Sequence, residues 1–271
     1  MTGLFAKLFG NNDIEKNIDK KQPNGDDEST RRLEAGWLFK DEKASVIWES
    51  PKPVNLEHPK SNNAKSASVC PAAIQFDRLH YAINCPVDLH LRFVRGADGE
   101  TKLTNVDGAM SSVRPAGLQK ILVVSPPEEW RHPARPIIQI ATPFVFVADQ
   151  NIYVNQFPPF LHYPKNPLPG VQICGRFPID VWPRMHMWAL EWHDMDKDLI
   201  LKRGEPLFYV RFESEKPGSV VRLVEAERTP ELLSYISQIT DVTNYVNQSF
   251  QLFDAARERR PETLLVARKK N

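Results

Sequence analysis

The sequence predicts a mainly β fold, and three observations carry this prediction. Residues 185–192 (MHMWALEW) and 207–212 (LFYVRF) place apolar side chains on both alternating faces, as strands covered on each side do. The chain holds 23 prolines, which interrupt helices, against 12 glycines. Residues 137–148 (IIQIATPFVFVA) are rich in β-branched and aromatic side chains. We therefore expect a β-sandwich or jelly-roll domain in which the first two runs are neighbouring strands.

Changes in composition set the expected domain boundaries. Residues 1–68 are typical of an extended and partly flexible N-terminal arm, because polar residues dominate much of this stretch. Within the arm, residues 36–48 predict a short hairpin. Strand-like runs then follow one another at short spacing, beginning with residues 72–83, so we place the β-sandwich domain at 69–225.

The apolar period changes after the last expected strand. Thr229, Pro230 and Glu231 form a helix start, with a capping residue, a proline in the first turn and an acid behind it. Apolar positions then recur at spacings of three and four, which predicts one long helix over 229–260, about 45 Å in length, and a tail over 261–271. Such a stripe is typical of a helix packed on its own sheet and also of a coiled-coil seam. The length favours the seam, so we predict a homo-oligomer or a protein partner held through this helix.

Composition excludes some classes of function. The 35 basic and 34 acidic residues leave a net charge of +1, which provides no general attraction for nucleic acid. No apolar run reaches the length of a transmembrane segment. The cysteines, Cys70, Cys85 and Cys174, are odd in number and form no CxxC pair, which favours a reducing compartment. We therefore expect a cytoplasmic protein, or a virion-associated one if it is encoded by a phage.

One proline-rich and aromatic loop is a candidate binding element. Residues 157–170 (FPPFLHYPKNPLPG) are too stiff for a flexible linker and too irregular for a helix or strand. Ordered loops of this kind either bind ligands or cover the end of a sheet. Combined with the tryptophan-bearing run that follows it, the loop suggests four ligand-binding residues at one end of the sheet: His162, Tyr163, Arg184 and Trp188.

Histidines and a carboxylate suggest a second kind of site. His186 and His193 flank the tryptophan-bearing run and Asp194 follows directly, and imidazole with carboxylate is a ligand set that suits zinc or iron. We name these three residues as candidate ligands of a divalent metal, as the alternative to a protein without a cofactor. The acidic run that begins at Asp194 also has the carboxylate spacing of a calcium loop, but Leu199 stands where such a loop needs glycine.

Two segments, 70–93 (CPAAIQFDRLHYAINCPVDLHLRF) and 169–212, resemble a poorly characterised family of bacterial and tailed-phage proteins. Members of that family combine a Cys-Pro segment with a later tryptophan strand and a Gly-Glu-Pro strand. The resemblance implies a bacterial or phage accessory protein and carries no activity. Residues 201–212 also resemble the closing strands of the deoxyuridine triphosphatase and deoxycytidine deaminase fold, which implies a jelly roll. The nucleotide-binding motifs of those enzymes are missing from this sequence.

Two classes of function follow. The first, which we favour, is a non-enzymatic interaction or assembly protein that self-associates through its C-terminal helix. Its N-terminal arm would dock on a partner, because residues 1–10 (MTGLFAKLFG) predict a short amphipathic segment that cannot be stable alone. The second is an enzyme, metal-dependent and cupin-like or acting on a small molecule, with its site at one end of the sheet.

Overall fold

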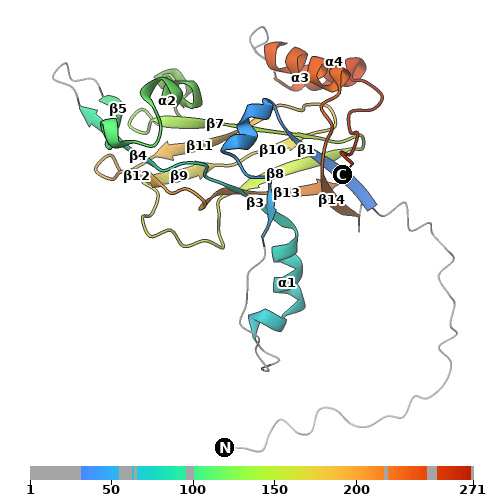
Figure 1. Ribbon diagram of the computed structural model, residues 1–271, viewed down its shortest axis with the longest axis horizontal. Coiled ribbons are helices and arrows are strands. Elements are labelled where there is room, and N and C mark those ends of the chain that lie inside the picture. Colours follow the sequence, from blue (N-terminus) through green and yellow to red (C-terminus); the bar gives the residue numbers. More distant parts are fainter. Residues whose placement is uncertain are drawn as a thin grey trace, which may run out of the picture.

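The structure is a computed structural model that describes residues 32–54, 63, 66–95, 101–216, 219–242 and 249–269. More of these residues lie in strands than in helices, so the mainly β prediction is confirmed. The described strands form three sheets (Figure 1). The expected amphipathic segment at residues 1–10, and most of the arm around it, lie outside the described residues.

The largest sheet is built around β7 (Ile137–Val147). β11 (Met185–Trp192) pairs antiparallel with β7, and β9 (Gly170–Ile173) pairs antiparallel with β11. Neighbouring residues of β7 belong to different apolar clusters, because Phe144 faces the sheets while Val145 faces the C-terminal helices. A strand buried on both faces needs apolar residues at successive positions, and this explains the unbroken apolar run in the sequence.

Two further strands share the other edge of β7. β1 (Arg32–Phe39) and β6 (Leu122–Val124) pair with different parts of it, and β14 (Val220–Glu225) lies parallel to β1 on the outside. The expected hairpin at 36–48 is therefore wrong: its first half belongs to β1, and the residues that follow form the 3-10 turn η2 (Glu42–Val46). β1 lies between β14 and β7 in the largest sheet. A domain that starts at residue 69, as expected from the sequence, would therefore lack this strand.

The other two sheets complete the β part of the molecule. The second sheet has the strand order β10-β8-β13-β3-β2, and the third has the order β12-β4-β5. All pairs within these two sheets are antiparallel. Their bounds are β2 (Lys52–Pro53), β3 (His80–Asn84), β4 (Leu89–Arg95), β5 (Thr101–Asn105), β8 (Ile152–Phe157), β10 (Arg176–Pro178), β12 (Leu199–Leu201) and β13 (Pro206–Ser214).

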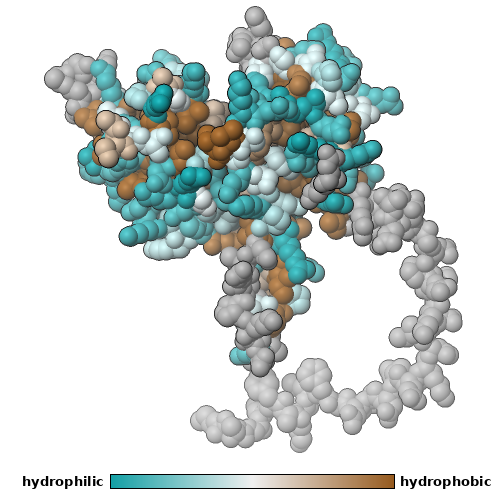
Figure 2. Space-filling model, in the orientation of Figure 1, coloured by the Kyte–Doolittle hydropathy of each residue, from teal (hydrophilic) through white to brown (hydrophobic). Residues whose placement is uncertain are grey.

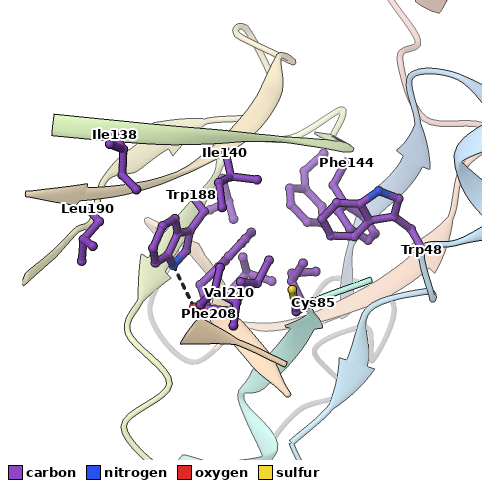
Figure 3. Close-up of a cluster of buried hydrophobic side chains, with 14 of the residues drawn as sticks. Trp48, Cys85, Ile138, Ile140, Phe144, Trp188, Leu190, Phe208 and Val210 are labelled. Atoms are coloured by element: carbon purple, nitrogen blue, oxygen red, sulfur yellow. Dashed lines mark hydrogen bonds between the residues drawn. The ribbon is translucent and has the colours of Figure 1, made fainter. Parts of the chain in front are cut away.

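Buried side chains from all three sheets form one apolar cluster. Figure 3 shows the part of this cluster in which side chains of β7 and β11 in the first sheet meet those of β13 in the second. Trp188 of β11 is fully buried in it, and its indole Nε1–H donates a hydrogen bond of 3.1 Å to the carbonyl oxygen of Leu207 in β13. This bond connects the first sheet to the second. The two apolar runs, expected side by side in one β framework, do belong to one core, but they do not pair as strands: β11 lies in the first sheet and β13 in the second.

The described helices lie outside the sheets (Figure 1). α2 (Pro115–Ile121) lies near β6 and β7, and α1 (Pro71–Arg78) projects from the body. None of the helices in the described ranges is long and apolar enough to cross a membrane. The remaining elements are α3 (Pro230–Val242), α4 (Ser249–Arg259) and three short 3-10 turns, η3 (Ala67–Val69), η4 (Gly108–Met110) and η5 (Pro127–Glu129).

The single helix expected over 229–260 is not found, because the described residues of this stretch form the two helices α3 and α4. The Tyr235 hydroxyl lies 2.9 Å from the carbonyl oxygen of Ala256. In one straight helix these two residues would be about 30 Å apart. The two helices therefore pack against each other, and the apolar stripe of α3 lies on the first sheet, with Leu232 and Ile236 buried in the same cluster as Val145.

The start of α3 is confirmed at the expected residue. The Thr229 side-chain oxygen accepts a hydrogen bond of 3.2 Å from the backbone N–H of Leu232, and Pro230 is the first residue of the helix. The cap satisfies one of the N–H groups that a helix start leaves without a partner.

Candidate functional site

The seven residues named from the sequence lie in four different places. Arg184 and His186 line one crevice, and His162 and Trp188 line a second, smaller cavity. His193 and Asp194 lie after the end of β11, and Tyr163 is 92% exposed on its loop. The structure therefore does not bring them together into the single site at one end of a sheet that the sequence suggested.

The three candidate metal ligands each have other surroundings. His193 Nε2 lies 2.8 Å from the Glu191 carboxylate, the Asp194 carboxylate lies 2.9 Å from Lys197 Nζ, and His186 is buried elsewhere in the crevice with Arg184. In the part of the chain that the structure describes, no group of three or more His, Cys, Asp or Glu side chains has an arrangement that could hold a metal ion.

Glu191 is a charged residue that the sequence did not single out. It is 4% exposed, and Arg131 Nε lies 2.6 Å from its carboxylate. Burial would raise the pKa of Glu191, but the hydrogen bonds from Arg131 and His193 outweigh this effect and lower it. The cluster ties the loop after β6 to the end of β11. His193 thus has a structural partner, which accounts for its position.

The cavity at His162 is too small for a ligand. Its volume is about 40 Å³, while one water molecule occupies about 30 Å³ of liquid. His162 Nε2 lies 3.8 Å from the Glu205 carboxylate. Trp188 also lines this cavity but is fully buried, and its indole N–H, the only donor of the side chain, is bonded to the carbonyl oxygen of Leu207. Trp188 is thus a core residue.

A wide groove of about 930 Å³ lies where β1 and β14 end. Trp37 and Trp48 line it together with several charged side chains. Arg228 donates to the carbonyl oxygens of Phe39 and Lys40, and Arg268 lies 2.6 Å from the Glu225 carboxylate. Both arginines of this groove are therefore already paired within the protein. The described residues that line the groove thus present no unpaired arginine to a ligand.

The clearest candidate for an interaction is an apolar surface on α1. Ala72, Phe76 and Leu79 are exposed at helical spacings of four and three, so they share one side of the helix. Phe160, from the proline-rich loop, places its ring 5.5 Å from the ring of Phe76. Phe76 is 45% exposed and Phe160 is 43% exposed. We call these four residues the α1 surface, and Figure 2 shows apolar side chains reaching the surface over α1.

A buried histidine supports the α1 surface from below. His80 is fully buried, its Nδ1 lies 2.8 Å from the Phe76 carbonyl oxygen, and its ring contacts those of Phe76, Phe157 and Phe160. Burial lowers the pKa of His80, so the neutral imidazole donates its Nδ1–H to that carbonyl. The Tyr209 ring packs against that of Phe160 in a T-shaped arrangement, with the centroids 5.3 Å apart. The exposed rings are thus held on a packed aromatic base.

The α1 surface was missed because residues 72–83 were predicted to be a strand. Residues 71–78 are instead helical, and the strand β3 begins at His80. A signal was present: Pro71 follows Cys70, and proline is favoured in the first turn of a helix. The prediction that the proline-rich loop is a binding element stays open, because Phe160 of that loop contributes to this surface.

No protein-family model matches this chain, and no curated protein matches it either.

Proposed function

We propose that this protein is a non-enzymatic interaction protein that self-associates through the α1 surface. One observation carries the proposal: Phe76 and Phe160, from two segments far apart in sequence, touch each other and yet expose close to half of each side chain. Single exposed apolar residues are common and need no explanation, but apolar side chains that gather from separate segments mark interaction sites.

The buried aromatic residues beneath the α1 surface favour binding, because they hold its exposed rings in place. Because His80 contacts the rings of both Phe76 and Phe160, and Tyr209 contacts that of Phe160, these rings are already ordered before a partner arrives. An ordered side chain loses less conformational entropy on binding than a free one. Aromatic residues on a packed base are the kind of anchor that contributes most to interface energies.

We take the partner to be a second copy of this chain. A copy related by a two-fold axis presents the same apolar side chains, so the contact would be apolar on both sides without complementary charges. The net charge of +1 means that two copies repel each other very little. The apolar stripe of α3, which first suggested self-association, is covered by the protein's own sheet, so this role moves to α1.

Light scattering of the full chain over a range of concentrations tests the proposal. We expect the mass of a dimer for the wild type, and the mass of a monomer for the double variant Phe76→Ser and Phe160→Ser. Met110→Ser is the matched control, because Met110 is 89% exposed on η4, outside the α1 surface. Circular dichroism verifies that each variant is folded.

A second variant tests whether the loss of the dimer could come from the removal of the two rings and a change in local packing. Ala72→Glu places a charge on the α1 surface while leaving both rings intact, and glutamate is a good helix former. We expect it to be monomeric as well. A wild type that stays monomeric at all concentrations, or an Ala72→Glu chain that dimerises as the wild type does, would contradict the proposal.

Two finer statements belong to the same proposal. The three sheets are proposed to form a β-sandwich or jelly roll, supported by the single apolar cluster to which all three contribute. A bacterial or tailed-phage origin is supported by the resemblance of residues 70–93, which contain α1. The enzyme alternative has no comparable support, because the histidines named for it lie apart.

A further inference from the structure

A crevice opens where the chain crosses from the first sheet to the second. β9 pairs with β11 only from Ala189 onward, and the chain then turns at Cys174 and Gly175 into β10 of the second sheet. Gln156 of β8 spans the gap: its N–H donates to the Gly175 carbonyl oxygen (2.9 Å) and its amide Nε2–H to the Met187 carbonyl oxygen (3.2 Å). We call the cavity at this point, about 190 Å³ in volume, the β11 crevice.

His186 lies in the wall of the β11 crevice and is unusual for a buried polar residue. It is 4% exposed, and neither ring nitrogen has a hydrogen-bond partner among the described residues, with Nδ1 completely buried. Its ring is held between those of Phe146 and Phe177, with centroid distances of 5.0 and 5.5 Å. Buried polar groups nearly always have a partner, so this imidazole is expected to find one in whatever occupies the crevice.

Arg184 lines the same crevice, two residues before His186. Its side chain is exposed, and within the described ranges its guanidinium makes no hydrogen bond or ion pair. Although the residue is exposed, neighbouring protein atoms partly desolvate its guanidinium and lower the pKa of this group. The positive charge of Arg184 also lowers the pKa of His186, because the two groups lie close enough to repel each other when both are charged. The β11 crevice therefore combines an unpaired cation with an unpaired neutral imidazole.

We propose that the β11 crevice binds a small organic monocarboxylate, with the carboxylate on Arg184 and His186 and the apolar part of the ligand against Phe177 and Met187. The guanidinium can hold a carboxylate through two parallel N–H donors. A neutral imidazole adds one further N–H. This inference is independent of the α1 surface.

Charge and size together select the class of ligand. Burial keeps His186 uncharged, since it lowers the pKa of its imidazole to about 3. Among the described residues that line the crevice, Arg184 is therefore the one that offers a charge to an anion. One positive charge suits a monocarboxylate better than a phosphate dianion. Phe177 and Met187 are joined in the lining by the apolar residues Ile173 and Ala189, and together these side chains suit a short hydrocarbon part. The volume corresponds to roughly six water molecules, enough for an acid of a few carbon atoms.

Titration of the full chain with butyrate, followed by backbone amide NMR, tests the proposal. We expect saturable shifts in residues around the crevice, and an affinity at least roughly tenfold lower for Arg184→Gln. Arg176→Gln is the matched control, because Arg176 lies nearby on β10 but stacks on the Tyr153 ring, 3.5 Å from its centroid. It should bind butyrate as the wild type does. Butyramide, which has a similar shape without the charge, should bind far more weakly.

Alkylation of Cys174 provides a readout on the wild type alone. Cys174 is an exposed residue that lines the crevice, so butyrate should slow the reaction of its thiol with iodoacetamide, while the reaction of Cys70 stays unchanged. The proposal is overturned if butyrate has no effect at tens of millimolar, if Arg184→Gln binds it equally well, or if butyramide or inorganic phosphate binds more tightly than butyrate.

Discussion

The apolar sides of α3 and α1 are a natural comparison, because the protein covers one and leaves the other open. Leu232, Ile236 and Ile239 of α3 are each at most 4% exposed and lie on the first sheet. Phe76 and Leu79, at the corresponding side of α1, are 45% and 40% exposed. A helical apolar stripe therefore shows that a helix needs a partner, and it does not show whether that partner belongs to the same chain.

The largest effect expected from this comparison concerns stability. Leu232→Ala, at a fully buried position, should lower the free energy of unfolding by about 2–5 kcal/mol, since it removes buried methyl groups and leaves a cavity. Leu79→Ala is the matched control on α1 and should cost less than about 1 kcal/mol, because Leu79 is 40% exposed in the single chain. Urea unfolding of both variants measures the difference. Equal losses would mean that the two helices are covered to the same extent.

Tyr235 provides an intermediate effect that depends on pH. Burial raises the pKa of Tyr235 to about 12, while the unfolded chain has the ordinary value near 10. The unfolded state therefore loses its proton first, so the stability from this group is present below about pH 10 and is lost as the pH rises toward 12. By pH 11 the loss should be about 1 kcal/mol.

The control for this prediction is Tyr235→Phe, which cannot ionise. Urea unfolding at several values from roughly pH 9 to 11 should give a flatter stability curve for the variant than for the wild type. Parallel curves would show that the Tyr235 hydroxyl, placed between the carbonyl oxygens of Val181 and Ala256, is open to solvent.

The smallest effect concerns the two helix starts. Thr229 caps α3 with its side chain, whereas Cys70, in the same position before α1, makes no capping hydrogen bond. Thr229→Ala should cost about 1 kcal/mol, and Cys70→Ser should stabilise the chain by a few tenths to about 1 kcal/mol. In thermal unfolding, we expect the midpoint temperature to fall for Thr229→Ala and to rise for Cys70→Ser. A loss of stability in both variants would show that Cys70 contributes through packing.

Much of the strand content could be predicted from local patterns. Residues 137–148 and 185–192 have apolar residues at successive positions, and both form strands that are buried over most of their length. Thr229 and Pro230 located the start of α3 because capping depends on a few adjacent residues. Which strands pair with each other could not be predicted in this way, since strand pairing depends on the topology of the whole chain. Nothing local indicates that β1 pairs with β14, or that β11 and β13 belong to different sheets.

The site was predicted only in part for the same reason. Arg184 and His186 were named on residue type, and the structure places both in the β11 crevice. His162 and His193 were named on the same basis, and each has a carboxylate neighbour elsewhere, Glu205 and Glu191. Residue type identifies groups capable of chemistry. Whether they converge depends on which strand edges meet, and a sequence of one protein does not contain that information directly.

The position of β1 constrains how the chain can fold. Arg32, at its start, pairs with Val220, so most of the chain must be synthesised before this strand acquires its outer neighbour. Until then β1 has an unpaired backbone edge that can recruit other strands, as in aggregation. Contacts between residues so distant in sequence also slow folding, because a long loop must close before they form. We therefore expect slow refolding, and reliance on chaperones during synthesis, to be properties of this topology.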